Sequence, residues 1–151
     1  MFRAMTKSGK EVFGWHIYNP STKKHYISNC WFKQEFCGVQ IPSLNEVIPE
    51  TIAMDTGQTD KNGIDIYGSF KLDGVMTKGG DVVERKEEHD IDCFDVETII
   101  TKWYIMFNHY EGMIVCHNIL SGNETRLSEH IKDIKIIGKQ YEVNKCKTKI
   151  K

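Results

Sequence analysis

The densest group of oxygen-bearing side chains in this sequence lies between Asp60 and Asp65. Asp60, Asn62 and Asp65 carry carboxylate and amide oxygens, which are the ligands that Ca²⁺ prefers. An EF-hand loop has glycine in its sixth position and a bidentate glutamate in its twelfth, whereas Gly63 stands fourth here. Aspartate bonds the backbone two residues on, and asparagine and glycine tolerate positive φ. The segment is therefore predicted to be a tight turn without a metal ion.

Thiol and imidazole groups are the next candidates, because zinc sites use both. The chain has five cysteines and six histidines, but no C-x-x-C pair, so neither a zinc ribbon nor a disulfide framework is indicated. His89 lies near Cys93, and Cys116 adjoins His117. Adjacent residues of a strand point to opposite faces, so Cys116 and His117 are not expected to share one ion. Free thiols are the simpler interpretation.

Covalent and phosphate chemistry have no local signature in the chain. A cysteine–histidine nucleophile needs neighbours in space that spacing alone does not reveal. Gly79-Gly80 fits neither G-x-x-x-x-G-K-[ST] nor G-x-G-x-x-G and is predicted to be a turn. No cofactor, metal or catalytic residue is therefore assigned.

The charge balance bears on nucleic-acid binding. With 20 basic and 21 acidic side chains the net charge is −1, so no overall positive field draws the chain to polyanions. Lysines alternate at the end of the chain, and three tryptophans could stack bases; these residues are Lys145, Lys147, Lys149, Lys151, Trp15, Trp31 and Trp103. A solvated terminus and core aromatics are the favoured interpretations. The longest apolar run is 103–107, too short for a membrane span, so a cytoplasmic protein without a membrane partner is expected.

Strands dominate the predicted structure. Aromatic and β-branched residues between turn signals indicate strands, and these segments are 2–5, 11–18, 25–28, 64–67, 103–107, 113–120 and 134–138. Short helices are predicted around 43–47 and after Ser128. The segment 84–95 has six acidic residues and is predicted to be a solvated excursion.

The segments 103–107 and 113–120 are predicted to pair as a hairpin through a loop at 108–112. This loop places Phe107 opposite Met113 and Trp103 opposite His117. His117 is therefore predicted to lie on the core face. Short strands at this spacing favour a small barrel.

The middle of the chain, VIPETIAMDTGQTDKNGIDIYGSF, resembles the YopX family of phage and prophage proteins. The residues that match the family pattern are Pro49, Glu50, Thr51, Thr56, Gly57, Asp60, Lys61, Asn62, Gly63, Ile66 and Tyr67. Weaker matches are the opening Phe2, Arg3, Ala4, Gly9, Glu11, Val12 and Gly14, and the closing Ile137, Gly138, Tyr141, Glu142 and Asn144. The family's glutamate-glycine-aspartate after the tyrosine is replaced here by Gly68-Ser69-Phe70.

The resemblance implies a mainly β (β-rich α+β) fold with a small SH3-type barrel, N-terminal hairpins and at most short helices, and a place in the host bacterial cell. The resemblance implies no established biochemical activity. Residues 1–151 are expected to form a single YopX-like unit; the alternative is two lobes, about 1–58 and about 59–151, the second a β-barrel lobe with the acidic excursion at 84–95. The matched residues are expected to be structural.

Three functions remain open at this point. The favoured one is a non-catalytic phage accessory protein that binds itself or a phage or host protein through edge strands. The alternatives are a nucleic-acid-associated small-barrel module, and an enzyme whose site is assembled from scattered residues. Fold analogy alone does not decide among them.

Overall fold

The computed structural model describes residues 1–29, 34–35, 38–39, 43–92, 95–108, 112–129 and 131–142, with the backbone alone at 34–35, 38–39, 87–92 and 95–97. The mainly β fold with few, short helices is confirmed. The elements are β1 (Phe2–Met5), β2 (Glu11–Asn19), β3 (Lys24–Ser28), β4 (Gln34–Glu35), β5 (Gly38–Val39), β6 (Leu44–Glu46), η1 (Pro49–Thr51), β7 (Ala53–Thr59), β8 (Asp65–Gly68), β9 (Lys71–Leu72), β10 (Val75–Met76), β11 (Asp81–Asp92), β12 (Asp95–Asn108), β13 (Met113–Asn118), β14 (Glu124–Arg126), η2 (Leu127–Glu129) and β15 (Ile134–Lys139).

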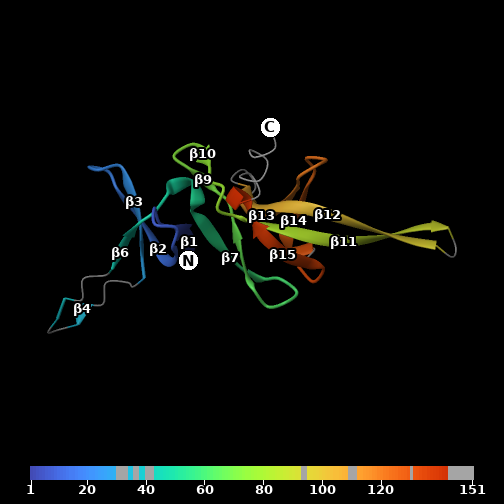
Figure 1. The fold of residues 1–151 in the computed structure, drawn as a ribbon, viewed down its shortest axis with the longest axis horizontal. Coiled ribbons are helices and arrows are strands. Elements are labelled where there is room, and N and C mark those ends of the chain that lie inside the picture. Colours follow the sequence, from blue (N-terminus) through green and yellow to red (C-terminus); the bar gives the residue numbers. More distant parts are fainter. Residues whose placement is uncertain are drawn as a thin grey trace.

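Two antiparallel sheets carry most of the chain. One has the strand order β6-β3-β2-β1-β7-β8 and the other β14-β13-β12-β11-β15, and the two lie side by side along the molecule (Figure 1). The expected barrel is not closed: within the described residues each sheet has two end strands. There are two buried clusters, one around Ile27 and Ile52 and the other around Ile105 and Leu127. Ile66 of β8, in the first sheet, belongs to the second cluster. The division into two lobes near residue 58 stays a prediction.

The first sheet is built from tight hairpins, as alternating apolar residues and turn signals predicted. Phe2 pairs with Gly14 and Met5 with Glu11 across the first turn, and β3 pairs antiparallel with β2. The alternation turns Ala4, Val12 and Ile27 inward, where they are buried. The segment 43–47 was predicted as a helix, which is wrong: β6 forms there and pairs with β3.

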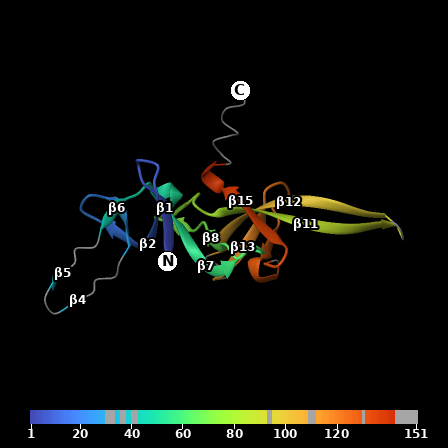
Figure 2. The same ribbon diagram turned by 60° about the horizontal axis from the view of Figure 1, so that its bottom comes forward.

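The described residues of the acidic segment, 84–92 and 95, lie in β11 and β12 of the second sheet. β11 pairs with β12 from Val82 to Asp92, but with β15 only from Asp81 to Arg85, so the outer part is a two-stranded ribbon. Figure 2 shows it reaching away from both sheets. The described part of the predicted excursion is thus paired strand, with a shift of register between Asp90 and Asp92.

The predicted register of the next hairpin is wrong by one residue. Trp103 lies opposite Asn118, and His117 lies opposite Tyr104. A slip of one residue moves every side chain to the other face, so His117 leaves the core face and its side chain is 34% exposed. Cys116 takes the inward place and is 2% exposed. Around Ser128 the structure describes a single 3₁₀ turn, η2, which is shorter than the predicted helix.

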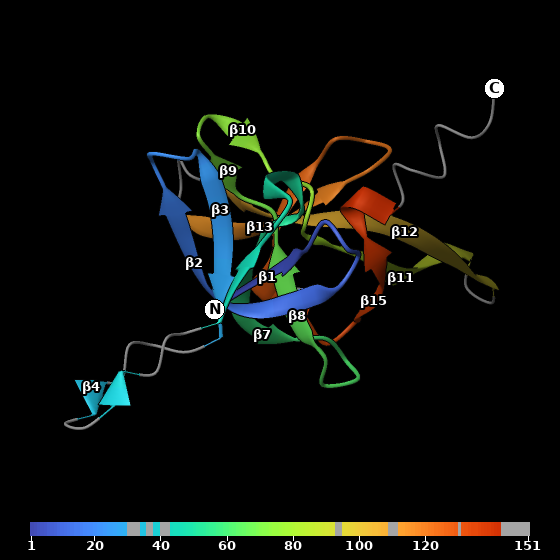
Figure 3. The ribbon, with the colours of Figure 1, turned by 60° about the vertical axis from the view of Figure 1, so that its left-hand side comes forward.

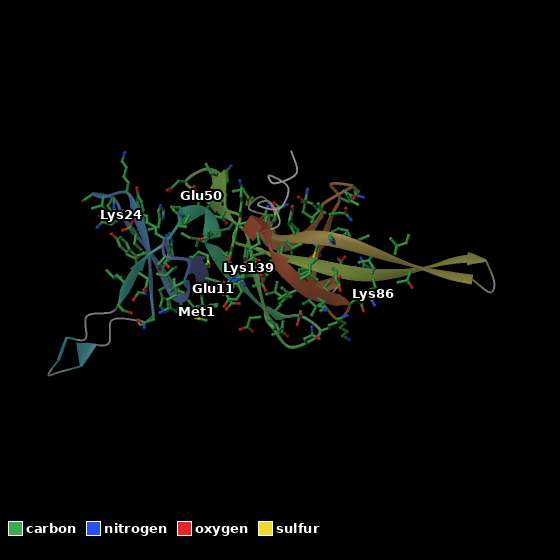
Figure 4. All side chains as sticks on the ribbon, in the orientation of Figure 1. Met1, Glu11, Lys24, Glu50, Lys86 and Lys139 are labelled. Atoms are coloured by element: carbon green, nitrogen blue, oxygen red, sulfur yellow. The ribbon has the colours of Figure 1, made fainter. Side chains whose placement is uncertain are left out.

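Ser69 joins the two sheets. Its N–H donates to the Ile105 carbonyl at 2.9 Å and its carbonyl accepts from the Phe107 N–H at 2.8 Å. Its hydroxyl donates to Gln140 and accepts from the Gly80 N–H. Glu11 and Lys139, labelled in Figure 4, form an ion pair across the same junction. The two sheets are therefore connected by backbone and side-chain bonds as well as by the chain itself.

Candidate functional site

The Asp60–Gly63 segment is a tight turn, as its residue types predicted. The Gly63 N–H donates to the Asp60 carbonyl at 2.9 Å, and Gly63 has φ 77°. Asn62 tolerates positive φ, but it does not adopt it in this turn. One Asp60 carboxylate oxygen accepts the N–H groups of Asn62 and Ile64, and the other accepts the Ile136 N–H at 3.1 Å.

These contacts define what the Asp60 carboxylate does. Burial raises the pKa of Asp60, but the backbone N–H donors outweigh that effect and hold the pKa below its ordinary value. Both oxygens point to protein donors, which is an arrangement for a structural turn. The turn also covers the outer edge of β15, because the Lys61 N–H donates to the Ile134 carbonyl at 3.2 Å.

The other residues that match the YopX pattern lie in the framework of the first sheet. Pro49 and Glu50 begin η1, and the Thr51 hydroxyl donates to the Ile48 carbonyl and accepts from the Met5 N–H. The Thr56 hydroxyl donates to the Ile66 carbonyl at 2.8 Å. The remaining matches, Gly57, Ile66 and Tyr67, lie in β7 and β8. The structure thus spreads these residues over turns and strand pairs and does not gather them around one cavity.

Metal-ligand candidates are also separated. Cys116 points into the core and His117 away from it, where its Nδ1 lies 3.3 Å from Glu124. Among the residues with described side chains, no group of three or more His, Cys, Asp and Glu is placed to hold an ion. His89, Cys93, Trp31 and the lysines from 145 onward lie outside these residues. No helix in the described ranges is long and apolar enough to cross a membrane.

Residues that sequence reasoning passed over line a large hollow in the described part of the chain. A groove of about 650 Å³ lies between the β9–β10 hairpin and the β12–β13 pair. Its walls include Lys71, Met76, Met106, Phe107, Val115 and Glu124. Figure 3 shows the hairpin beside β13. We call this hollow the groove; its volume lies in the range of ligand-sized sites, and its methionines are side chains that adapt to varied partners.

A second hollow of about 320 Å³ continues from the groove toward β14. It shares Val115 and Glu124 with the groove and adds Met113, Arg126 and Glu129. The hollowed surface therefore runs up to β14, the end strand of the second sheet, and its lining becomes more polar there.

The backbone of β14 has one side free for pairing. The Asn118 N–H donates to the Asn123 carbonyl and the Ile119 N–H to the Lys102 carbonyl. Alternation along an antiparallel ladder then directs the Thr125 backbone toward Cys116. The Glu124 carbonyl and the Arg126 N–H therefore face away from β13, and no other described strand pairs with them. We call these two groups the β14 edge.

The other end strands differ from β14. β15 is covered by the Asp60 turn, and β8 runs into the Ser69 junction with β12. β6 adjoins residues 40–42, which the structure does not describe. Among the described strands, β14 thus combines free backbone groups with a neighbouring apolar hollow.

A signal for this site was present in the sequence. Asp73-Gly74 between apolar residues is a strong hairpin signature, and both residues have positive φ, 48° and 86°. It predicts the β9–β10 hairpin that forms one wall of the groove. The polar strand Glu124–Arg126 had no such signal, because an exposed edge strand has the composition of a loop.

No known family model, curated protein or solved structure matches the chain.

Proposed function

We propose that this chain is a non-catalytic accessory protein of YopX type, encoded by a phage or prophage, which acts in the host cytoplasm by binding protein. The observation that supports this proposal is the β14 edge with the groove beside it. An added extended strand gains main-chain hydrogen bonds at such an edge, and pockets alongside it receive alternate side chains. The occupant is therefore an extended segment of protein, either of another copy or of a partner.

The groove suits this kind of occupant. Met76, Met106 and Val115 offer an apolar floor, whereas Lys71 and Glu124 place one charge of each sign at its wall. An apolar centre with a mixed polar rim is the usual anatomy of a protein interface. A nucleic acid bound here would lie near the Glu124 carboxylate as well as the Lys71 ammonium group, so the groove offers no net positive charge.

The test is site-specific photocrosslinking. A benzophenone side chain replaces Met76, which lies in the groove and is 38% exposed, and in a control protein replaces Ile137, which lies on β15 and is 40% exposed. Each protein is irradiated alone and in host lysate. We expect a covalent protein adduct from position 76 and none from position 137, and the captured segment, resynthesised as a peptide, should bind the unmodified protein.

The salt dependence of binding distinguishes protein binding from the competing nucleic-acid function. Nucleic-acid binding weakens steeply with salt through counterion release, whereas an interface with an apolar centre changes far less. Crosslinks to nucleic acid at position 76, or equal protein adducts at both positions, would contradict the proposal.

A further inference from the structure

We infer that the extended segment bound at the β14 edge is β14 of a second copy, so that the chain forms a symmetric dimer with its two-fold axis at Thr125. This inference rests on the proposed function and names the partner. Symmetric dimers use the same surface twice, so the surface must complement itself. Strand β14 complements itself in two ways: through the backbone groups of the β14 edge and through the charges of Glu124 and Arg126.

The backbone groups of the β14 edge are reciprocal. Antiparallel pairing about Thr125 places residue 124 of one copy opposite residue 126 of the other. The outward Arg126 N–H of each copy then donates to the outward Glu124 carbonyl of its partner. Arg126 directly precedes η2, and its carbonyl is not needed for these bonds.

The side chains of the same two residues are complementary. Glu124 and Arg126 are two apart in a strand, so both project from one face. In the dimer each Glu124 lies opposite the other copy's Arg126, which gives two cross-strand pairs of opposite charge. Arg126 has no ion pair with any residue whose side chain is described, and is available for this contact. A net charge of −1 adds little repulsion between copies.

Apolar surface lies next to this strand. A stable dimer buries about 1,200–2,000 Å² in total, more than two three-residue strands provide. Leu120, in the turn that leads into β14, is 92% exposed, and Met113 lines the hollow below the strand. Burial of these side chains beside the paired strands gives the interface an apolar component.

The test exchanges the charges. Glu124→Arg places arginine opposite arginine twice, and Arg126→Glu places glutamate opposite glutamate twice. Sedimentation of the wild type should give twice the chain mass, and each single substitution should weaken dimerisation about tenfold or more. An equimolar mixture of the two variants should form a heterodimer, because every opposed pair is again of opposite sign. The double variant Glu124→Arg with Arg126→Glu should dimerise like the wild type.

The wild type offers a readout that does not depend on variants. Hydrogen exchange at the Arg126 amide should slow as protein concentration rises, whereas exchange at the Thr125 amide, already bonded to β13, should not change. A wild type that stays monomeric at all concentrations, or a dimer indifferent to both reversals, overturns the inference. A monomer that still gives an adduct with another protein at position 76 overturns only the dimer and leaves the proposed function standing.

Discussion

Arg3 and Asp81 form a buried ion pair, with 2.6 Å between Nη2 and Oδ1, which joins the first strand of the chain to the start of β11. The guanidinium also donates to the Gly79 carbonyl and lies 4.4 Å from the centre of the Tyr67 ring. The second carboxylate oxygen of Asp81 accepts the Tyr67 N–H at 2.7 Å. One carboxylate thus links three segments that are far apart in sequence.

Removing one member of this pair should destabilise the protein strongly. Asp81→Ala removes the buried carboxylate and leaves the Arg3 charge with the more exposed Glu11, whose Oε1 lies 3.5 Å from Nε. The expected loss is about 3 kcal/mol in the free energy of unfolding by urea. Arg3→Met should cost a similar amount, and the double variant should cost less than the sum. Lys24→Ala, which breaks an exposed ion pair with Glu46, should leave the midpoint almost unchanged. Additive losses at the two buried positions would contradict this account.

Asp60→Asn should loosen the turn that covers β15. The amide keeps one acceptor oxygen but presents N–H groups to the Ile136 N–H, so one buried donor loses its partner. The expected loss is about 1–3 kcal/mol at neutral pH. Asp133→Asn, at an exposed position, is the control and should stay within about 0.5 kcal/mol.

The loss of stability caused by Asp60→Asn should depend on pH. The pKa of Asp60 is lowered in the folded protein, so its contribution is full above the ordinary aspartate pKa of about 3.9 and is lost as the pH falls through the folded value. The difference between the parent and Asp60→Asn should therefore shrink in acid. A difference that is constant from pH 7 to pH 3 would show that the carboxylate charge is unimportant.

Gly79→Ala should be poorly tolerated, because its Cβ would lie 2.1 Å from the Thr51 carbonyl oxygen. Backbone atoms at that distance must move, and overpacking of this kind costs about 1–3 kcal/mol. Gly138→Ala is a matched control: its Cβ would have no atom closer than 3.8 Å, and its φ is not positive. Equal melting temperatures of the two variants would contradict the close approach.

His117 and Asn118 test the observed register of the β12–β13 hairpin. His117 is half-exposed, so His117→Ala should change the unfolding free energy by about 0.5 kcal/mol or less. Asn118 is buried and accepts the N–H groups of Leu120 and Ser121, so Asn118→Ala should cost about 1–2 kcal/mol. A larger loss of stability for His117→Ala than for Asn118→Ala would support the register predicted from the sequence.

Local patterns predicted local structure well here. The N-terminal hairpins, the Asp60 turn and the last strand follow from alternation and turn residues that act over a few positions. The register at His117 failed because one residue more or less in the loop at 108–112 decides it. Asp81 could not be distinguished from the other aspartates by sequence, since its role depends on Arg3, 78 residues away. The strand Glu124–Arg126 was not predicted, because exposed strands and loops share a polar composition.

Ser69 is fully buried at the junction of the sheets. Ionised side chains at a buried junction would need partners of their own. This junction uses a hydroxyl and backbone groups.

Two histidines lie against each other beneath the β9–β10 hairpin. His16 Nε2 lies 2.9 Å from His25 Nδ1, and the two rings are within 6° of parallel. One hydrogen occupies the space between these nitrogens, so at least one imidazole nitrogen of the pair is unprotonated. Asp73 lies 3.9 Å from the other side of His25.

Burial lowers the pKa of His16, and the charge of His25 lowers it further, whereas Asp73 opposes both. The unfolded chain takes up a proton here as the pH falls below about 6.5, and the folded protein resists it. The unfolding free energy should therefore be highest above pH 6.5 and fall by up to about 1.4 kcal/mol per pH unit below it, until the folded pKa is reached. His16→Gln keeps a hydrogen-bonding group without the titration and should flatten this slope between pH 7.5 and 5, whereas His117→Gln, at the half-exposed position, should leave it unchanged. Urea titrations at each pH measure the slope, and parallel profiles for the parent and His16→Gln would assign the acid sensitivity to other groups.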